Sequence, residues 1–390
     1  MRAIVVGAGI GGLTAALSLR RAGHEVTLVE QSRRLTEIGA GIQLAPNATR
    51  VLRRLDLLDA VAEQSTRPAH VSFRTWSDGR EICRYVIGRA AEEEFGAPYL
   101  QVHRADLQQA LAAAVPPASL RLGTAVVGID QDDTAAHVTT ASGERLDADL
   151  VVAADGIRSA ARQWLFGADE AVFSHTVAYR ALLPAAEVAD LDLPEYAGWL
   201  GPGRHVVHYW LRRGALLNVV AVFVTDHAAQ ESWTARAEPG EQLRTFSGWD
   251  PRLLTVLDRA GQVLRYGIYT RAPLTRWHVG RVTLLGDSAH AMVPFQAQGA
   301  AQAIMDAAVL GDCLTAAAPD EVPEALDRYV RRRVPAATSV QAGSARAGHD
   351  HHLPDGPEAE ARNARLVSLA AENKFGPHSA AWPVDVLADD

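Results

Sequence analysis

The stretch Arg2–Glu30, RAIVVGAGIGGLTAALSLRRAGHEVTLVE, decides the fold. The apolar run Ala3–Val6 predicts a buried strand, and the apolar spacing over Leu13–Arg21 predicts a helix. A second β-branched run, His24–Glu30, predicts another strand. Because a strand, a helix and a strand in this order form a parallel crossover unit, we expect a doubly wound α/β sheet to begin here.

The turn between the first strand and the helix fits the pattern G-x-G-x-x-G, with Gly7, Gly9 and Gly12 at its fixed positions. Gly7 permits the tight turn, Gly9 lets the backbone approach a pyrophosphate, and Gly12 lets the helix pack against the strand. The helix N-terminus attracts phosphates, and Glu30 at the end of the next strand can accept hydrogen bonds from a ribose. We therefore expect a bound dinucleotide, and the motif alone does not separate NAD from FAD.

Composition and net charge exclude several classes of protein. The chain has 390 residues, of which 48% are hydrophobic and 22% charged, and its formal net charge is −8. A negative balance argues against a nucleic-acid partner, and no apolar run approaches the ~20 residues that a membrane span requires. Two cysteines, Cys83 and Cys313, make no disulfide framework. With no leader pattern at the start, we expect a cytoplasmic protein without a membrane span.

Strand and helix patterns alternate along the rest of the chain. Buried strands predicted at Leu150–Ala154 and Val282–Leu285 resemble the first one, a long helix is expected over Gln298–Leu314, and β-rich segments lie between these parts. We expect one discontinuous nucleotide-binding domain, an inserted β-rich substrate-binding domain and a C-terminal helical segment. The predicted ranges are 1–70, 98–171 and 270–320 for the first, 71–97 and 172–269 for the second, and 321–390 for the third.

An acidic residue beside a glycine follows two of the predicted strands, as Asp155-Gly156 and as Gly286-Asp287. Each acid then lies beyond the carboxyl end of a strand, where sheets of this type bind ligands. Together with the phosphate loop, in this order, the two turns resemble the group A FAD-dependent aromatic hydroxylases, which have the para-hydroxybenzoate hydroxylase fold. The likeness is strongest to the branch of salicylate, 3-hydroxybenzoate and 6-hydroxynicotinate hydroxylases.

The resemblance implies FAD as the resident cofactor. NADH or NADPH would visit as a transient co-substrate, since no second G-x-G-x-x-G stands between a strand and a helix. Hydride transfer to the flavin and O₂ addition at its C4a atom would give a hydroperoxide that hydroxylates an activated aromatic ring. Besides the phosphate loop and Glu30, the residues implied to contact FAD are Gln43 in QLAPNA, Arg104 in HRADLQQAL, Asp155, Gly156, Asp287, Pro294, Gly299 and Ala300.

The resemblance also places the substrate chemistry on the segment WLGPGRHVVHYWLRRG. There His205 and Tyr209 match the catalytic base and its neighbouring tyrosine. Side chains on a strand alternate between its faces, so these two share one face and His208 points to the other. Either Gln296 or Gln298 could contact the substrate. Arg180 is either a functional cation or a surface charge on its strand.

We therefore expect a monooxygenase for a small hydroxylated or amino-hydroxylated aromatic carboxylate, with or without decarboxylation, as a monomer or homodimer. Two alternatives stay open: an NAD-dependent dehydrogenase with a single Rossmann site, and a non-catalytic flavin-binding module. The histidine-rich run Gly348–His352 invites a metal site, which we discount because the segment continues as part of the C-terminal helical region. We expect Arg331–Arg333 to be the solvated face of a terminal helix.

Overall fold

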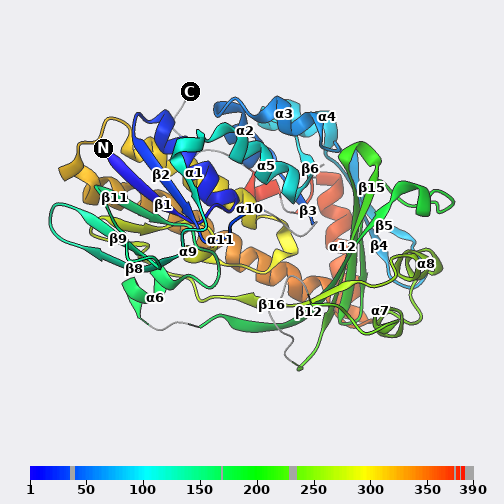
Figure 1. Cartoon of the computed structure of the whole chain (residues 1–390). Coiled ribbons are helices and arrows are strands. Elements are labelled where there is room, and N and C mark those ends of the chain that lie inside the picture. Colours follow the sequence, from blue (N-terminus) through cyan, green and yellow to red (C-terminus); the bar gives the residue numbers. More distant parts are fainter. Residues whose placement is uncertain (36–39, 168–169, 228–234, 373–374, 378, 383–390) are drawn as a thin grey trace.

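The computed structural model describes residues 1–35, 40–167, 170–227, 235–372, 375–377 and 379–382, so the last eight residues of the predicted segment 321–390 lie outside the described part. Figure 1 shows two large sheets side by side, with long helices against both. The expected class is confirmed: the chain is an α/β protein in which a parallel sheet is accompanied by a β-rich part and C-terminal helices. The residue boundaries between the parts remain a proposal.

The first sheet is the predicted doubly wound one. Its strands pair in parallel except at the β17 edge, and helix α1 follows β1 as expected. Its two inner neighbours, β1 and β11, bury almost every side chain, which explains their continuous apolar sequence. In spatial order the strands are β17 (His278–Val279), β18 (Val282–Leu284), β11 (Leu150–Ala153), β1 (Arg2–Val6), β2 (Glu25–Glu30) and β7 (Leu120–Leu122).

The second sheet has seven strands and supplies one wall of the site. Its face away from the first sheet packs on the short helices α7 (Glu241–Thr245) and α8 (Pro251–Arg259), through residues such as Trp199 and Phe246. The strands in order are β16 (Leu264–Thr270), β12 (Val172–Pro184), β15 (Leu216–Val224), β14 (Arg204–Leu211), β13 (Tyr196–Gly201), β4 (His70–Thr75) and β5 (Glu81–Val86).

Two small sheets complete the β-structure. A three-stranded antiparallel sheet packs beside the first sheet, and a two-stranded one carries Gln43 to the space between the large sheets. Their members are β8 (Val126–Gln131), β9 (Ala136–Thr140) and β10 (Arg145–Ala148), then β3 (Gly41–Leu44) and β6 (Leu100–His103).

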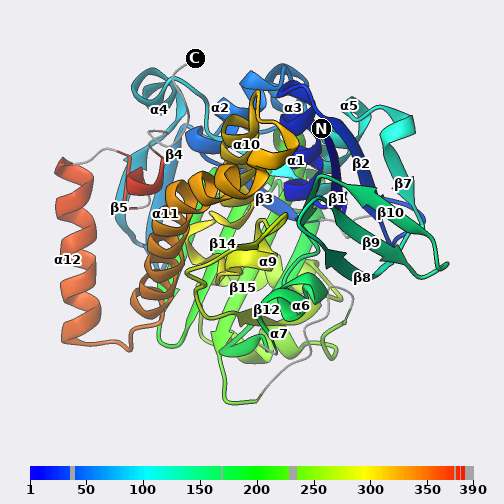
Figure 2. The ribbon, with the colours of Figure 1, turned by 90° about the vertical axis from the view of Figure 1, so that its left-hand side faces the viewer.

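Helices α1 and α10 form the centre of the larger core, and α11 packs on α10. Figure 2 shows α11 running past the second sheet and α12 standing at the outer edge, where α12 packs on β5. The other bounds are α1 (Ile10–Arg21), α2 (Pro46–Arg54), α3 (Leu58–Glu63), α4 (Gly88–Phe95), α5 (Arg104–Ala114), α6 (Ala160–Phe166), α9 (Asp287–His290), α10 (Gly299–Leu314), α11 (Val322–His351) and α12 (Pro357–Glu372).

One expectation about α11 is wrong. Arg331 is exposed and Arg332 is half-buried, but Arg333 is buried and bonded to Asp306 of α10. Successive residues of a helix are about 100° apart, so three consecutive arginines cannot all share a solvated face. The third one falls on the face that packs against α10.

Candidate functional site

A cavity of about 400 Å³ lies between the two large sheets, and most of the predicted site residues line it. Its wall includes the phosphate loop at one end and the inner face of β14 at the other. Of the predicted residues, those on the wall are Gly9, Gln43, Arg104, Gly156, His205, Tyr209, Asp287, Pro294, Gln296, Gln298, Gly299 and Ala300, while Gly7, Gly12, Glu30 and Asp155 are not among the lining residues.

The phosphate loop has the backbone geometry that its glycines predict. Gly7 has φ of +99°, and a Cβ there would lie 2.5 Å from the carbonyl oxygen of Ala154. A Cβ on Gly12 would lie 1.8 Å from the carbonyl oxygen of Gly7, so no larger residue fits. A Cβ on Gly9, in contrast, would meet no atom within 4 Å. Gly9 therefore borders open space at the N-terminus of α1, where a phosphate is favoured.

The carboxylate of Glu30 is held at the end of β2 by two backbone hydrogen bonds. The N–H of Ala8 donates to Oε2, and the N–H of Ser32 donates to Oε1, both at 2.8 Å. Each carboxylate oxygen can accept a further hydrogen bond. Glu30 thus stays available to the hydroxyl groups of a nucleotide ribose beside the phosphate loop.

Asp155 provides a test of the cofactor fit. Its Oδ2 accepts a hydrogen bond from the N–H of Ala161 at 3.2 Å, whereas its Oδ1 is buried without a hydrogen-bond partner in the described part of the chain. A buried oxygen of this kind indicates a ligand donor. Cβ atoms built on Gly156 and Gly299 would also meet nothing within 4 Å. These open approaches and the unpaired oxygen fit a hydroxylated dinucleotide such as FAD.

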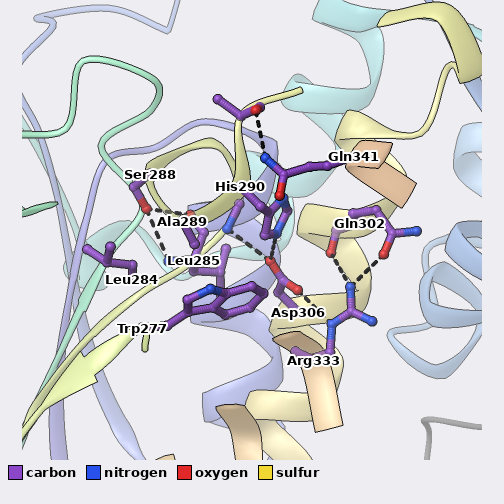
Figure 3. Close-up of polar contacts among 12 residues, drawn as sticks. Trp277, Leu284, Leu285, Ser288, Ala289, His290, Gln302, Asp306, Arg333 and Gln341 are labelled. Atoms are coloured by element: carbon purple, nitrogen blue, oxygen red, sulfur yellow. Dashed lines mark hydrogen bonds and ion pairs between the residues drawn. The ribbon is translucent and has the colours of Figure 1, made fainter. Parts of the chain in front are cut away.

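A buried polar network around Asp306 holds the loop that carries Asp287 (Figure 3). No sequence motif indicated this network. Asp306 of α10 accepts hydrogen bonds from the backbone N–H of Gly286 at 2.9 Å and from Arg333 Nε at 2.6 Å. His290 Nε2 lies 2.5 Å from the same carboxylate, and Arg333 also donates to Gln302 at 2.6 Å. The network ties the β18–α9 turn to α10 and α11.

Burial alone would raise the pKa of Asp306, but the contacts with His290 and Arg333 outweigh it and lower that pKa to about 2. Asp306 is therefore ionised at neutral pH and compensates the buried guanidinium of Arg333. The preceding residue, Met305, is buried in the apolar core.

At the other end of the cavity, β14 presents its residues as the strand period predicts. His205 pairs with Val222 and Tyr209 with Asn218 of β15, and both histidine and tyrosine line the cavity. His208 lies on the opposite face, where its Nδ1 accepts a hydrogen bond from Trp199 Nε1 at 3.1 Å and its Nε2 lies 3.0 Å from the Pro194 carbonyl oxygen. That face belongs to the α7–α8 core, so His208 has no access to the cavity.

His205 is 3% exposed and sits in a cluster of rings. Its Nδ1 lies 2.7 Å from Nε2 of His352, and the ring of Phe295 meets it edge-on at 5.3 Å between centroids. Burial, and then the neighbouring His352 and His351, lower the pKa of His205 well below its usual value. At neutral pH the ring is uncharged and can accept a proton.

A group of tyrosines forms the remaining aromatic wall, and of its members only Tyr209 was expected from the sequence. The hydroxyls of Tyr99 and Tyr196 both donate to Oε1 of Gln43, at 2.8 and 3.0 Å. Tyr209 meets the ring of Tyr196 edge-on. Gln43, predicted to contact the flavin, thus also fixes two rings of the wall. These contacts join residues far apart in the chain, and no local motif marks them.

The charges on the cavity wall are mainly positive. Arg104 and Arg180 line it, and Asp287 is the one acidic residue among the described lining residues. Arg180 donates to the Tyr266 hydroxyl at 3.0 Å and lies over the Tyr266 ring at 5.1 Å. Arg180 is therefore part of the cavity wall, which favours a functional cation over a surface charge.

Gln296 and Gln298, the two candidates for a substrate contact, differ in their surroundings. Gln298 is buried, and its Oε1 accepts hydrogen bonds from Nδ2 of Asn47 at 3.0 Å and from Nε2 of Gln302 at 3.3 Å. Gln296 packs against Gly343 of α11, where a Cβ would lie 2.9 Å from its amide nitrogen. Gln296 is thus the less constrained of the two candidates for a substrate contact.

The described residues offer neither a metal site nor a membrane-spanning helix. Among the residues that the structure describes, no group of three or more His, Cys, Asp or Glu side chains is arranged to hold a metal ion. Within the same residues, no helix combines the length and apolarity that crossing a bilayer would demand.

Comparison with known proteins agrees with this geometry. The model of the FAD binding domain family matches residues 1–344. The chain is 39% identical to a 3-amino-4-hydroxybenzoate 2-monooxygenase of Streptomyces platensis, over 93% of this chain and 91% of that one. It is 35% identical to the 3-hydroxybenzoate 6-hydroxylase of Klebsiella oxytoca, with the same coverage. Klebsiella pneumoniae HpxO complexed with FAD and uric acid superimposes with a TM-score of 0.82 at 26% identity, over 97% of each chain.

The family match covers most of the chain, and the matched part contains the phosphate loop, the Asp155 turn and the Asp287 turn. The relatives are matched over nearly their whole length, so the likeness includes the second sheet with His205 as well as the nucleotide-binding part. The chain therefore belongs to the FAD-binding monooxygenase family and is an FAD-dependent aromatic monooxygenase.

Proposed function

We propose that the protein hydroxylates the ring of a small aromatic carboxylate bearing a hydroxyl or amino-hydroxyl group, using NADH or NADPH and O₂. The observation that carries this proposal is the cavity, which combines an aromatic wall, a buried histidine and two arginines. The Streptomyces platensis relative is named as a 2-monooxygenase of 3-amino-4-hydroxybenzoate. We propose this acid, or a close analogue, as the first substrate to test.

FAD would be held by the phosphate loop, Glu30, Asp155 and the Asp287 turn, and when bound it supplies the hydride acceptor and the oxygen chemistry. The protein's own part is to bind the acid, orient its ring and control its proton. A ring hydroxyl becomes more electron-donating when it loses its proton, so a base beside it makes the ring a better nucleophile. We assign this base to His205, with Tyr209 beside it on the same face of β14.

Arg180 is the side chain that we propose for the substrate carboxylate. It lies on β12, one strand beyond β15, so it and His205 reach the cavity from the same sheet. A guanidinium pairs well with a carboxylate because its donors form a planar fork. With the carboxylate at Arg180 and the hydroxyl at His205, the ring would lie across the inner face of the sheet.

The first experiment tests the substrate class. The purified FAD-loaded protein is mixed with NADH or NADPH, and reductant consumption is followed with and without hydroxybenzoates, aminohydroxybenzoates and hydroxypyridine carboxylates. We expect a stimulated rate with at least one aromatic acid, together with a product that is heavier by one oxygen or has exchanged its carboxyl group for a hydroxyl. A chain that binds FAD but forms no hydroxylated product from any of these acids contradicts the proposal and favours a non-catalytic flavin-binding role.

Arg180→Gln tests the carboxylate contact. Losing a charge-assisted hydrogen bond of about 1.5–3 kcal/mol should raise KM for the acid roughly 10- to 100-fold. The corresponding amide or ester of the substrate, which carries no charge, should be affected much less. Equal effects on the acid and on its uncharged analogue would show that Arg180 shapes the cavity without binding the carboxylate.

A further inference from the structure

The C-terminal end of α11 brings a second histidine to the one that lines the cavity. His205 Nδ1 and His352 Nε2 lie 2.7 Å apart, and the two rings are 4.8 Å apart between centroids. The backbone N–H of Gly203 donates to the His352 carbonyl oxygen at 3.0 Å, so the β13–β14 turn is tied to the helix end. Gly348 admits the Phe295 ring close to α11 on the cavity side. The histidine pair is therefore held by backbone contacts as well as by its own hydrogen bond.

A hydrogen bond between two imidazoles requires one ring to donate an N–H and the other to accept it. When His205 donates from Nδ1, its Nε2 carries no proton and can accept one from a ligand in the cavity. His352 then accepts at Nε2 and carries its own proton on Nδ1. This arrangement gives the pair a proton entry at His205 and a proton exit at His352.

Because His205 is buried, a proton that it takes up needs a route by which it can leave. The pKa of His205 is held well below its usual value by burial and by His352 and His351. An imidazolium in that position would be strongly disfavoured, so His205 is a poor place to store a proton taken from a phenol. It can still transfer one if the Nδ1 proton leaves as the Nε2 proton arrives.

His352 is suited to pass the proton on. It is only half-buried, whereas His205 is almost completely enclosed. It is also the C-terminal cap of α11, where the helix dipole favours a positive charge. Burial, and then His349, lower its pKa to about 4, so it too carries a charge only briefly at neutral pH. The ionisable groups that act on the pair are His349 and His351 of α11. The His351 ring also lines the cavity, where it packs beside His205 and the apolar ring of Phe295.

We propose that His205 and His352 form a proton relay that carries the substrate hydroxyl proton from the cavity to solvent. The substrate O–H bond breaks and its proton binds Nε2 of His205, while the Nδ1 proton of His205 passes to Nε2 of His352. The Nδ1 proton of His352 is released to water. One proton enters and one leaves, and no electrons are transferred.

Both rings end in the opposite tautomer, so the relay must run backwards once in each cycle. Return of a proton to the product oxygen through the same two rings restores the starting tautomers. His352 is thus a positioning and relay residue for His205, and the inference rests on the proposed role of His205 as the base.

The test uses a chromogenic phenol, a nitro-substituted hydroxybenzoate, which absorbs differently when ionised. It is mixed with the FAD-loaded protein in a stopped-flow instrument without reductant, and the rate of phenolate formation is measured against pH. In the wild type we expect fast ionisation of the bound ligand at neutral pH. In His352→Gln, which keeps a polar side chain but cannot pass on a proton, the rate should fall roughly 10- to 100-fold. The ligand's dissociation constant should change little.

Two further measurements separate a relay from a structural role. The rate of His352→Gln should recover as pH rises, because hydroxide can then accept the proton that His352 no longer passes on. Added imidazole should restore part of the rate in His352→Ala, where space is left for it. Arg346→Gln is the matched control, since this side chain is exposed on the same helix and is not among the groups that shift the pKa of His205 or His352. We expect it to behave as the wild type.

The outcomes distinguish the two proposals. If His205→Gln abolishes phenolate formation and His352→Gln leaves its rate unchanged, the relay is wrong and the base stands. If His205→Gln has no effect, the proposed base is wrong and the relay falls with it. A His352→Gln variant that only weakens ligand binding, with a normal ionisation rate and no imidazole rescue, shows a structural role and also overturns the relay.

Discussion

At the scale of single residues, Gly9 and Gly12 of the phosphate loop have different physical roles. Gly12 touches the backbone of its own loop, so its replacement acts on folding. Gly9 touches nothing within 4 Å in the chain, and its φ of −70° and ψ of 178° are open to any residue. The motif predicts both positions, but only the structure separates the glycine needed by the fold from the one that borders the cofactor space.

This difference gives a paired prediction. Gly9→Ala should fold with nearly unchanged thermal stability and bind FAD at least about tenfold more weakly, a loss of about 1.4 kcal/mol. Gly12→Ala should lose folding stability before cofactor affinity can be measured, because its Cβ would overlap the Gly7 carbonyl. Differential scanning fluorimetry and FAD titration of the apoprotein provide the two readouts. Normal FAD affinity in Gly9→Ala would place the pyrophosphate elsewhere.

Sequence patterns predict which residues of one strand share a face, but they do not predict contacts between residues far apart in the chain. Strand period alone predicts that His205 and Tyr209 share a face and that His208 does not, and the β14 register confirms it. Period cannot predict His352, which is 147 residues from His205 in the chain. The histidine-rich run at 348–352 is visible in the sequence, but its interpretation as part of the C-terminal helical region gives no partner for His205.

At the scale of elements, the local patterns predict β1, β2, β11 and β18 within one residue at each end, and they miss the first turn of α1. The helix expected over Gln298–Leu314 is observed as α10, Gly299–Leu314, because its apolar spacing and its packing face agree. The error at Arg333 has the opposite cause. Its charge argued for solvent, whereas its position on α11 points it at Asp306, and an ion pair between two helices leaves no local trace.

The Asp306 network should therefore control stability. Asp306→Asn leaves the buried Arg333 without its counter-charge, which should lower the free energy of unfolding by about 3–5 kcal/mol at neutral pH. FAD affinity should fall as well, since Asp306 also holds the Gly286 N–H. Urea unfolding followed by fluorescence measures the first effect. Asp190→Asn, at an exposed ion pair with Arg259, is the control and should cost under about 1 kcal/mol.

The stability difference between the wild type and Asp306→Asn should depend on pH, because folding lowers the pKa of Asp306. The folded-state pKa of Asp306 is about 2, below its ordinary value of 3.8. A depressed carboxyl pKa contributes stability that is complete above the ordinary value and is lost as pH falls towards the folded one. The gap between wild type and Asp306→Asn should thus be constant from neutral pH down to about 5 and narrow between pH 4 and 2. A gap that widens on acidification would contradict this assignment.

At the scale of the whole molecule, the cavity is closed by a part of the chain that no motif marks. Phe375 and Trp382, beyond α12, line its wall near Tyr99. The Trp382 ring packs edge-on against Phe95, and the Asn47 side chain donates to the Ala381 carbonyl oxygen at 2.9 Å. Since Asn47 also bonds Gln298, the end of the described chain is joined to the start of α10 through one side chain.

We therefore expect Trp382→Ala to open the substrate end of the cavity while the sheets stay folded. Replacing a buried tryptophan by alanine in a core lowers the free energy of unfolding by about 3–5 kcal/mol. At Trp382 we expect the loss to weaken the docking of the terminal segment and to leave the rest of the fold intact. Water then enters where it is normally excluded, so NAD(P)H consumption should continue while the hydroxylated product per NAD(P)H falls and hydrogen peroxide rises. Product and peroxide assays on the same sample measure this ratio. Trp164→Ala, at a tryptophan on α6 that is 42% exposed, is the control and should keep the wild-type ratio, and an unchanged ratio in Trp382→Ala would show that the cavity is closed without this segment.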